Sequence, residues 1–190
     1  NELTVEGGRG SEVVLLDGFF LGGGIWSPSA NQGSDTGPQT LVLNGRLRIG
    51  RTSVVAAGGV LDLSFASDVH LEQGLVVLPG GILKLGGSVS LSSTDLGFIL
   101  NFGTILVESE DVGGTVDHHH GADDSSSSAI LPVLDIPYLV NFGSIDLAEK
   151  AGLQLSEHVQ LTVLPGAAIV MGEGCAFRCT SFADCRIRNL

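Results

Sequence analysis

A short unit of alternating apolar residues recurs along this chain, and it constrains the fold more than any other feature of the sequence. Examples are Val69-His70-Leu71, Leu83-Lys84-Leu85 and Ile105-Leu106-Val107, with Gly, Pro-Gly, Asn or Ser between the units. Successive side chains of a β-strand point to opposite faces, so a strand of about four residues needs only two apolar positions to bury one face. The pattern therefore predicts many short strands separated by tight turns.

The units recur at a nearly constant spacing. Gly59-Val60-Leu61-Asp62-Leu63 resembles Gly81-Ile82-Leu83-Lys84-Leu85 at an offset of 22 positions, and Val69-His70-Leu71 resembles Val89-Ser90-Leu91 at an offset of 20. A repeat of about 20 to 22 residues is typical of solenoids, in which each repeat forms one coil.

Two longer motifs also recur. Asn101-Phe102-Gly103-Thr104-Ile105 returns as Asn141-Phe142-Gly143-Ser144-Ile145 after 40 positions, and Leu78-Pro79-Gly80 returns as Leu164-Pro165-Gly166. Asn is expected at a turn, because its side chain tolerates left-handed backbone and forms local hydrogen bonds. The acidic and serine-rich stretch from Glu110 to Ser128 has no strand pattern, so we interpret it as a loop inserted into one coil.

Short strands at regular spacing fit a sandwich, a barrel or a solenoid. Antiparallel hairpins favour Asn-Gly or Asp-Gly turns, and the chain has only Asn44-Gly45 and Asp17-Gly18. We therefore predict an all-β fold, a right-handed parallel β-helix (β-solenoid) with coils of about 20–22 residues. It carries two long loop insertions, one from Ser27 to Thr40 and the other from Glu110 to Ser128.

The stretches LVVLPGGILKLGGSVSLSS, NFGTILVE and NFGSIDLAE resemble the coils of extracellular parallel β-helix proteins. These include adhesin-type passengers, surface-repeat proteins and, more distantly, pectin-lyase-like enzymes. The resemblance spans Leu41 to Gly172 and is generic to the architecture. It implies a secreted or cell-surface location and a role in adhesion, scaffolding or fibre building. It carries no family catalytic motif onto a residue of this chain.

We expect a single solenoid domain over residues 1–174 and a cysteine-containing segment over 175–190 that caps it or begins a following segment. The chain opens at Asn1 without a signal-peptide pattern, so we expect a mature form or a piece of a longer protein. Cys175, Cys179 and Cys185 are disulfide candidates, with free buried thiols and a metal site as alternatives. Their C-x3-C-x5-C spacing is unusual for zinc.

The formal charge of −12, from 21 acidic and 9 basic residues, argues against nucleic acid and anionic membrane as partners. No apolar run approaches the roughly 20 residues of a membrane-spanning helix. Arg46 and Arg48 alternate with Leu47 and Ile49, which predicts that the arginines share an outward face.

Three sets of side chains are candidates for chemistry. His118, His119, His120 and Asp123, in the loop, have the donor atoms of a metal site, although consecutive histidines are also common in exposed loops. Trp26 and Tyr138 are candidate aromatic platforms for a glycan, and Trp26 alternatively packs the base of a loop.

Asp62, Lys84 and Asp146 occupy outward positions of similar units and could line up across coils, as a polysaccharide-cleaving enzyme would require. Ordinary solvent-facing residues are the simpler interpretation, and it also fits His70 and His158.

The sequence as a whole favours a non-enzymatic structural or adhesive module of a larger extracellular or cell-surface protein, with self-assembly into a fibre as one form of that role. The expected partners are copies of itself or neighbouring domains, or a glycan or surface protein, and no cofactor is expected. The alternatives are a glycan-binding module and a polysaccharide lyase or hydrolase of β-helix type.

Overall fold

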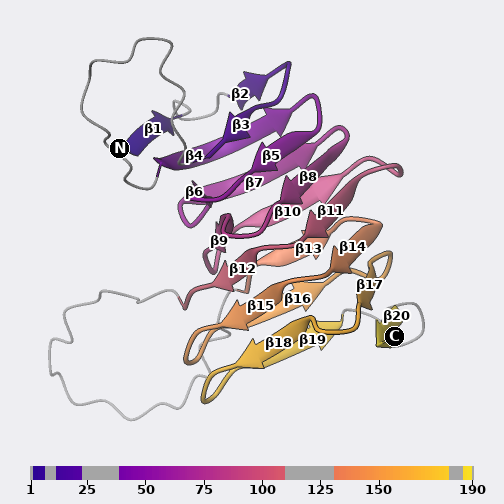
Figure 1. Cartoon of the computed structure of the whole chain (residues 1–190). Helices are drawn as coiled ribbons and strands as arrows, with labels where there is room; N and C mark the ends of the chain where they lie inside the picture. The colour runs from indigo at the N-terminus through magenta and orange to yellow at the C-terminus, as the bar shows by residue number, and fades with distance from the viewer. Residues whose placement is uncertain (1, 7–11, 23–38, 110–130, 180–185, 190) are drawn as a thin grey trace, which may run out of the picture.

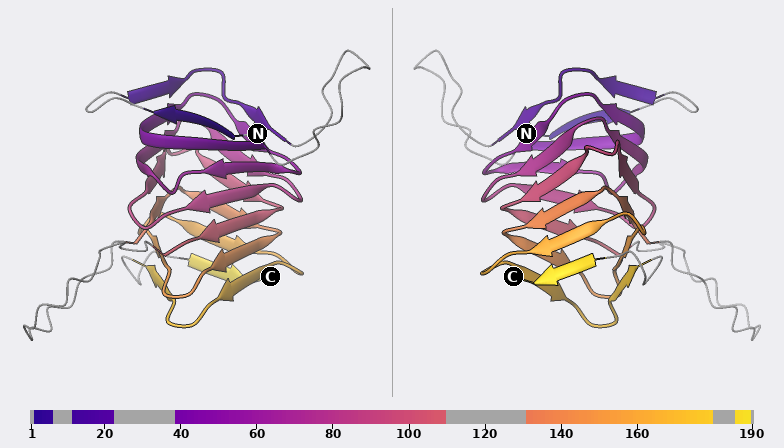
Figure 2. Two further views of the ribbon diagram at one scale, coloured as in Figure 1. Left: turned by 90° about the vertical axis from the view of Figure 1, so that its left-hand side faces the viewer. Right: turned by 90° about the vertical axis from the view of Figure 1, so that its right-hand side faces the viewer.

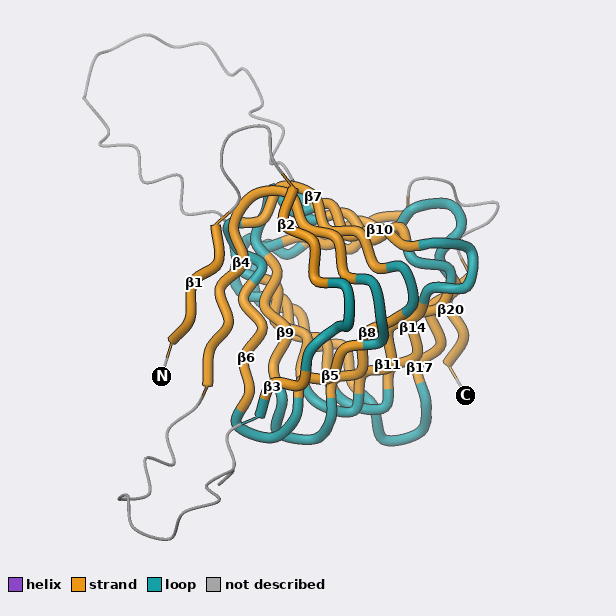
Figure 3. Tube along the Cα trace, turned by 90° about the horizontal axis from the view of Figure 1, so that it is seen from above, coloured by secondary structure: helices purple, strands orange, loops and turns teal. Residues whose placement is uncertain are grey.

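The computed structural model describes residues 2–6, 12–22, 39–109, 131–179 and 186–189, and these form strands and turns without a helix. All strand pairs are parallel, and the strands stack into an elongated body (Figure 1). Viewed along the stack, strands enclose the interior on three sides (Figure 3). The predicted parallel β-solenoid is confirmed.

Three faces make up the stack, and we name them A, B and C. Face A contains β1 (Glu2–Glu6), the first part of β4 (Gln39–Ile49), β6 (Gly59–Asp62), β9 (Ile82–Leu85), β12 (Thr104–Val107), β15 (Ser144–Leu147) and β18 (Ala168–Met171). Face B contains β2 (Glu12–Leu15), the second part of β4, β7 (Ala66–Leu71), β10 (Ser90–Ser93), β13 (Val133–Asp135), β16 (Gly152–Leu155) and β19 (Ala176–Cys179). Face C contains β3 (Phe20–Leu21), β5 (Ser53–Val55), β8 (Gly74–Val77), β11 (Phe98–Asn101), β14 (Tyr138–Asn141), β17 (Gln160–Val163) and β20 (Arg186–Asn189).

The pairing register fixes the coil length. Leu61 lies beside Leu83 and Leu83 beside Ile105, an offset of 22 residues each time. The offset of 20 taken from Val69 and Val89 is wrong, because Val69 pairs with Leu91. Side chains alternate between the two faces of a strand with a period of two. Offsets of 20 and 22 therefore give the same hydrophobic pattern, and the sequence alone does not distinguish them.

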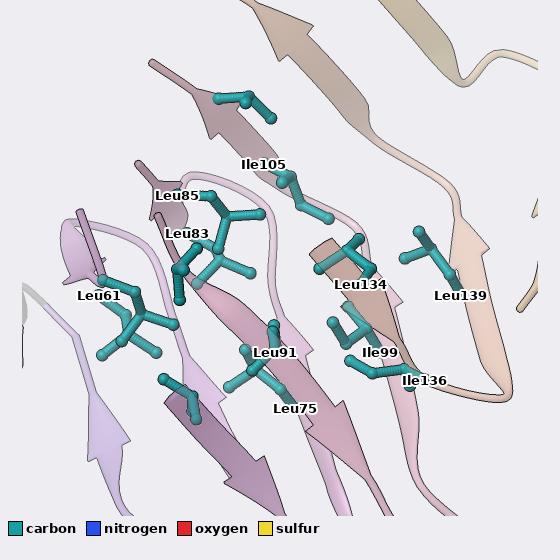
Figure 4. Packing of buried hydrophobic residues seen from close by; sticks show 14 of the residues in the cluster. Leu61, Leu75, Leu83, Leu85, Leu91, Ile99, Ile105, Leu134, Ile136 and Leu139 are labelled. Carbon is teal, nitrogen blue, oxygen red and sulfur yellow. The ribbon is translucent and has the colours of Figure 1, made fainter. Parts of the chain in front are cut away.

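Inward aliphatic side chains form columns that run through the stack. Leu41, Leu61, Leu83, Ile105 and Ile145 follow one another on face A, and all are buried. Side chains from the other faces meet them inside (Figure 4). The two side views in Figure 2 show the strands of successive coils lying one above another. Stacking like on like thus produces a continuous apolar core without large aromatic residues.

Asn101 and Asn141, the first residues of the recurring motif, lie side by side in adjacent coils, and both are fully buried. Asn101 Nδ2 donates to Asn141 Oδ1 at 2.7 Å and to the Ser144 carbonyl at 2.7 Å, while Asn141 Nδ2 donates to the Ala168 carbonyl at 3.0 Å. Neither has positive φ, so the expected left-handed backbone is wrong. The expected local hydrogen bond is present at Asn101, whose Oδ1 accepts from the Gly103 amide at 3.2 Å, and the other bonds run between coils.

The Phe and Gly of the motif stack in the same way. The Phe102 and Phe142 rings are stacked with centroids 4.3 Å apart and an interplanar angle of 14°. A Cβ on Gly143 would overlap the carbonyl oxygen of Gly103, so the chain can pass this corner closely only with glycine there. The 40 residues between the two copies of the motif therefore make up one coil with extra residues. The predicted insertion from Glu110 to Ser128 lies outside the described residues.

The Leu-Pro-Gly motifs occupy one corner of the solenoid. Leu78 N donates to the Val55 carbonyl and Leu164 N to the Asn141 carbonyl, each bonding one coil back. Gly80 and Gly166 have φ of 79° and 86°, a region that favours glycine.

At Asn44-Gly45 the chain does not form a hairpin. β4 continues through this pair from face A to face B, with a register shift between Gly45 and Arg46 and a φ of 85° at Gly45. β4 also begins at Gln39, so the predicted loop from Ser27 to Thr40 ends two residues too late, and its described part belongs to a strand.

Replacing one buried Asn by Val should destabilise the fold by about 1–3 kcal/mol, because it leaves the other Asn without its partner. Val fits this inward column, which continues to Val77 on one side and Val163 on the other. The double variant N101V/N141V should cost less than the sum of the two single variants, since both single changes break the same hydrogen bond. Urea unfolding measured by circular dichroism tests this, and strictly additive losses would contradict it.

Candidate functional site

The polar cluster on face A consists of Asp62, Lys84 and Glu108. Lys84 lies directly beside Asp62 in the next coil, and its Nζ is 3.2 Å from Asp62 Oδ2 and 3.2 Å from Glu108 Oε2. Asp62 Oδ1 also accepts a hydrogen bond from the Ser64 amide at 2.9 Å. The predicted alignment of Asp62 with Lys84 is therefore present. Asp146 lies two coils beyond Lys84, with Leu106 between them.

Both pKa shifts in this cluster favour the charged forms. Burial acts to raise the pKa of the Asp62 carboxyl, but hydrogen bonds with Ser64 and Lys84 outweigh it and the pKa is lowered. Burial acts to lower the pKa of Lys84, but its bonds to Glu108 and Asp62 prevail and the pKa is raised. The side chains of Asp62 and Lys84 are only 12% and 24% exposed. The arrangement is that of a partly buried ion cluster that ties three coils together.

Face B carries a ladder of charges and polar groups. Arg46 pairs with Asp68 at 3.6 Å, and Arg48 Nε donates to Glu72 Oε1 at 2.6 Å. The arginines share the outward face as predicted, since Leu47 between them is buried. Each pair connects one coil to the next, and their exposure makes each contribute little to stability.

The histidines outside the loop are outward residues, as the simpler interpretation held. His70 is partly exposed on face B, with Nδ1 3.2 Å from Ser92 Oγ in the next coil. His158 is exposed and its Nε2 lies 3.4 Å from Glu157.

Face C differs from the other two faces in charge. None of the strands β3, β5, β8, β11, β14 and β17 contains a charged residue, whereas β20 contains two arginines in its sequence. One outward column of this surface is apolar through five strands and consists of Phe20, Val54, Val76, Leu100 and Val140. We call the outward side chains of these six face C strands, β3, β5, β8, β11, β14 and β17, the uncharged surface.

Tyr138, the predicted aromatic platform, belongs to the uncharged surface. It is 46% exposed and lies between Phe98 in one coil and Gln160 in the next. The Phe98 ring covers Gly74, since a Cβ on that glycine would lie 2.6 Å from Phe98 Cζ. Phe98 and Tyr138 thus form a short second column beside the aliphatic one.

Several predicted site residues lie outside the described residues. These are Trp26, His118, His119, His120, Asp123 and Cys185. In the parts of the chain that are described, no three His, Cys, Asp or Glu side chains gather in a way that could hold a metal ion. The metal site in the loop therefore stays a prediction.

The described cysteines lie at the C-terminal end of the stack. Cys175 is a free thiol, partly buried, whose Sγ lies 2.8 Å from the Ala148 carbonyl oxygen. Cys179 is in β19, which pairs with β16, and β20 pairs with β17. The strands of the predicted terminal segment therefore continue the solenoid sheets.

Sequence reasoning missed Glu108 and the uncharged surface. Glu108 directly follows β12, at a corner, so the strand pattern gave it no role. The uncharged surface becomes visible in the sequence only after the coils are aligned, because its column has offsets of 22, 24 and 40 from Val54 to Val140.

No family model, curated protein or solved structure was found to match this chain. The described segments contain no helix long and apolar enough to cross a membrane.

Removing the Lys84 ammonium, in K84M, should destabilise the protein by about 1–3 kcal/mol at neutral pH, because the largely buried Asp62 carboxylate loses its cation. D62N/K84M should regain part of that loss, since the side-chain amide introduced by D62N can still accept the Ser64 hydrogen bond without carrying a charge.

The difference between wild type and K84M should depend on pH. The pKa of folded Asp62 lies below its ordinary 3.8, so its stabilisation is present above about that pH and lost as the pH falls through the folded value. The pKa of folded Lys84 lies above its ordinary 10.5, so its contribution is lost as the pH rises through the folded value. Urea unfolding from acid to alkaline pH tests this, and a pH-independent difference would contradict it.

Proposed function

We propose that this chain is a non-enzymatic structural module of a larger extracellular or cell-surface protein, serving as a rigid spacer and assembly surface. The observation that carries the proposal is the use of the outward charged groups on faces A and B. Lys84 binds two carboxylates from neighbouring coils, and Arg46 and Arg48 each bind one. The partly buried Lys84 cluster connects three coils and stiffens the body along its axis, and the exposed arginine pairs add little to this.

The spacing of the polar groups also supports this role over polysaccharide cleavage. A pair of catalytic carboxylates must flank a bond of the substrate with open space between them. The Asp62 side chain is only 12% exposed and is already bonded to Ser64 and Lys84. Leu106 separates Lys84 from Asp146. The extracellular location rests on the resemblance of the coils to surface β-helix proteins.

The cysteines belong to the same proposal. Because Cys175 is a free thiol, we infer that Cys179 and Cys185 form the disulfide of this sequence. Alkylation of the unfolded, unreduced protein followed by peptide mass spectrometry should label Cys175 alone. A disulfide would support an extracellular location, because disulfides persist in oxidising compartments. Labelling of all three cysteines would contradict the disulfide and remove that support.

Incubation with a panel of acidic and neutral polysaccharides tests the non-enzymatic role. Wild type and D62N should both release no product above the blank. Product that forms with wild type and disappears with D62N would overturn the proposal and assign catalysis to the face A cluster.

Small-angle X-ray scattering tests the stiffness of the body, since a stiff spacer should scatter as a body of fixed length.

A further inference from the structure

We propose that the uncharged surface on face C packs against the same surface of a second copy of this chain. The inference rests on the proposed structural role and names the partner. Its core consists of six outward side chains: Val54, Val76, Leu100, Val140, Phe98 and Tyr138.

The sheet of face C has apolar side chains on both of its sides. Parallel sheets are normally covered on both sides, and their strands then have apolar residues facing both ways. Face C has that composition: in β8 and β11, Leu75 and Ile99 are buried inside while Val76 and Leu100 face outward. Faces A and B, by contrast, present Lys84 and Arg48 to the solvent side. Strands β8 and β11 of face C therefore have the composition of a covered sheet, and the described residues supply no cover.

Charge favours face C over the other two faces for a contact between copies. The chain carries a formal charge of −12, so two copies repel each other at most relative orientations. In a two-fold interface the same patch meets itself, so any charge near its centre meets a like charge. The outward side chains of face A include Lys84 and Asp146, and those of face B include Arg46, Asp68 and Asp135, which lies on the strand next to the middle one. The uncharged surface lets two copies meet without burying an ion.

The size of the uncharged surface limits the strength of this contact. Six strands from β3 to β17, about 4.8 Å apart and about four residues long, give a surface of about 24 Å by 13 Å. That is roughly 300 Å² in projection per copy, below the roughly 800 Å² per partner of a standard stable interface. We therefore expect a weak dimer, with a dissociation constant above the roughly micromolar upper end found for standard-size interfaces. Copies tethered close to one another would still associate, because tethering raises their effective concentration to about the millimolar range.

Sedimentation velocity from about 10 to about 500 μM tests the proposal on the whole chain. Wild type should shift from monomer to dimer over this range. L100E should weaken association at least tenfold, because it buries a carboxylate against its own copy. L106E is the matched control: Leu106 is the outward leucine of the next strand, six residues along, on face A and beside Lys84. L106E adds the same charge and should dimerise as wild type does.

Three results would overturn the proposal: a wild type that stays monomeric at the highest concentration, an L100E variant that dimerises as wild type does, or equal weakening by L106E. Circular dichroism and thermal unfolding establish that the variants are folded. If L100E does not fold, Y138E places the same carboxylate at a more exposed position of the same core and should also weaken association at least tenfold. A monomeric wild type leaves the structural role standing and removes only the face C contact.

A glycan is the other occupant that this surface would suit, and the same proteins distinguish it. Wild type that is monomeric but sediments with insoluble cellulose or chitin, and loses that binding in Y138A, would overturn self-association and assign the surface to a polysaccharide. Dimerisation with no binding to either polymer is the result that we expect.

Discussion

Stacking of identical residue types between coils is the constraint on which the rest of this structure depends. Parallel pairing places each residue directly above its counterpart, so each side chain must be compatible with its neighbours in the adjacent coils. Leu61, Leu83 and Ile105 fill an aliphatic column, while Asn101 and Asn141 satisfy each other inside the core. An isolated Asn there would be costly to bury, and a pair in register is not. The recurring sequence motifs are the consequence of this requirement.

The outward columns follow the same rule with different chemistry on each side. On faces A and B, charged residues that are neighbours in a column have opposite signs and form ion pairs, as with Asp62 and Lys84 or Arg46 and Asp68. On face C the outward column is aliphatic and aromatic. A chain of high net charge thus has one side whose strands from β3 to β17 carry no charged residue, and we propose that copies of the chain would associate through it.

Much of the fold could be predicted from the sequence because periodicity reports directly on stacking. The 22-residue offset between Leu61 and Leu83 sufficed for the architecture. The register of Val69 did not follow, because a two-residue shift leaves the alternation unchanged. Two members of the ion cluster, Asp62 and Lys84, could be predicted because they lie in matching sequence units. The third, Glu108, could not, because it lies at a corner where no strand pattern applies. Face C could not be recognised because coils of unequal length hide its column until they are aligned.

Methyl–methyl nuclear Overhauser contacts in protein with labelled isoleucine, leucine and valine test the central claim most directly. The account predicts cross-peaks between Ile105 and Ile145, and between Ile145 and Ile169, which lie in successive coils despite sequence offsets of 40 and 24. It also predicts contacts of Leu83 with both Leu61 and Ile105. Absence of the Ile105–Ile145 cross-peak in the folded protein would contradict the stacking of these coils, and with it the assignment of every face.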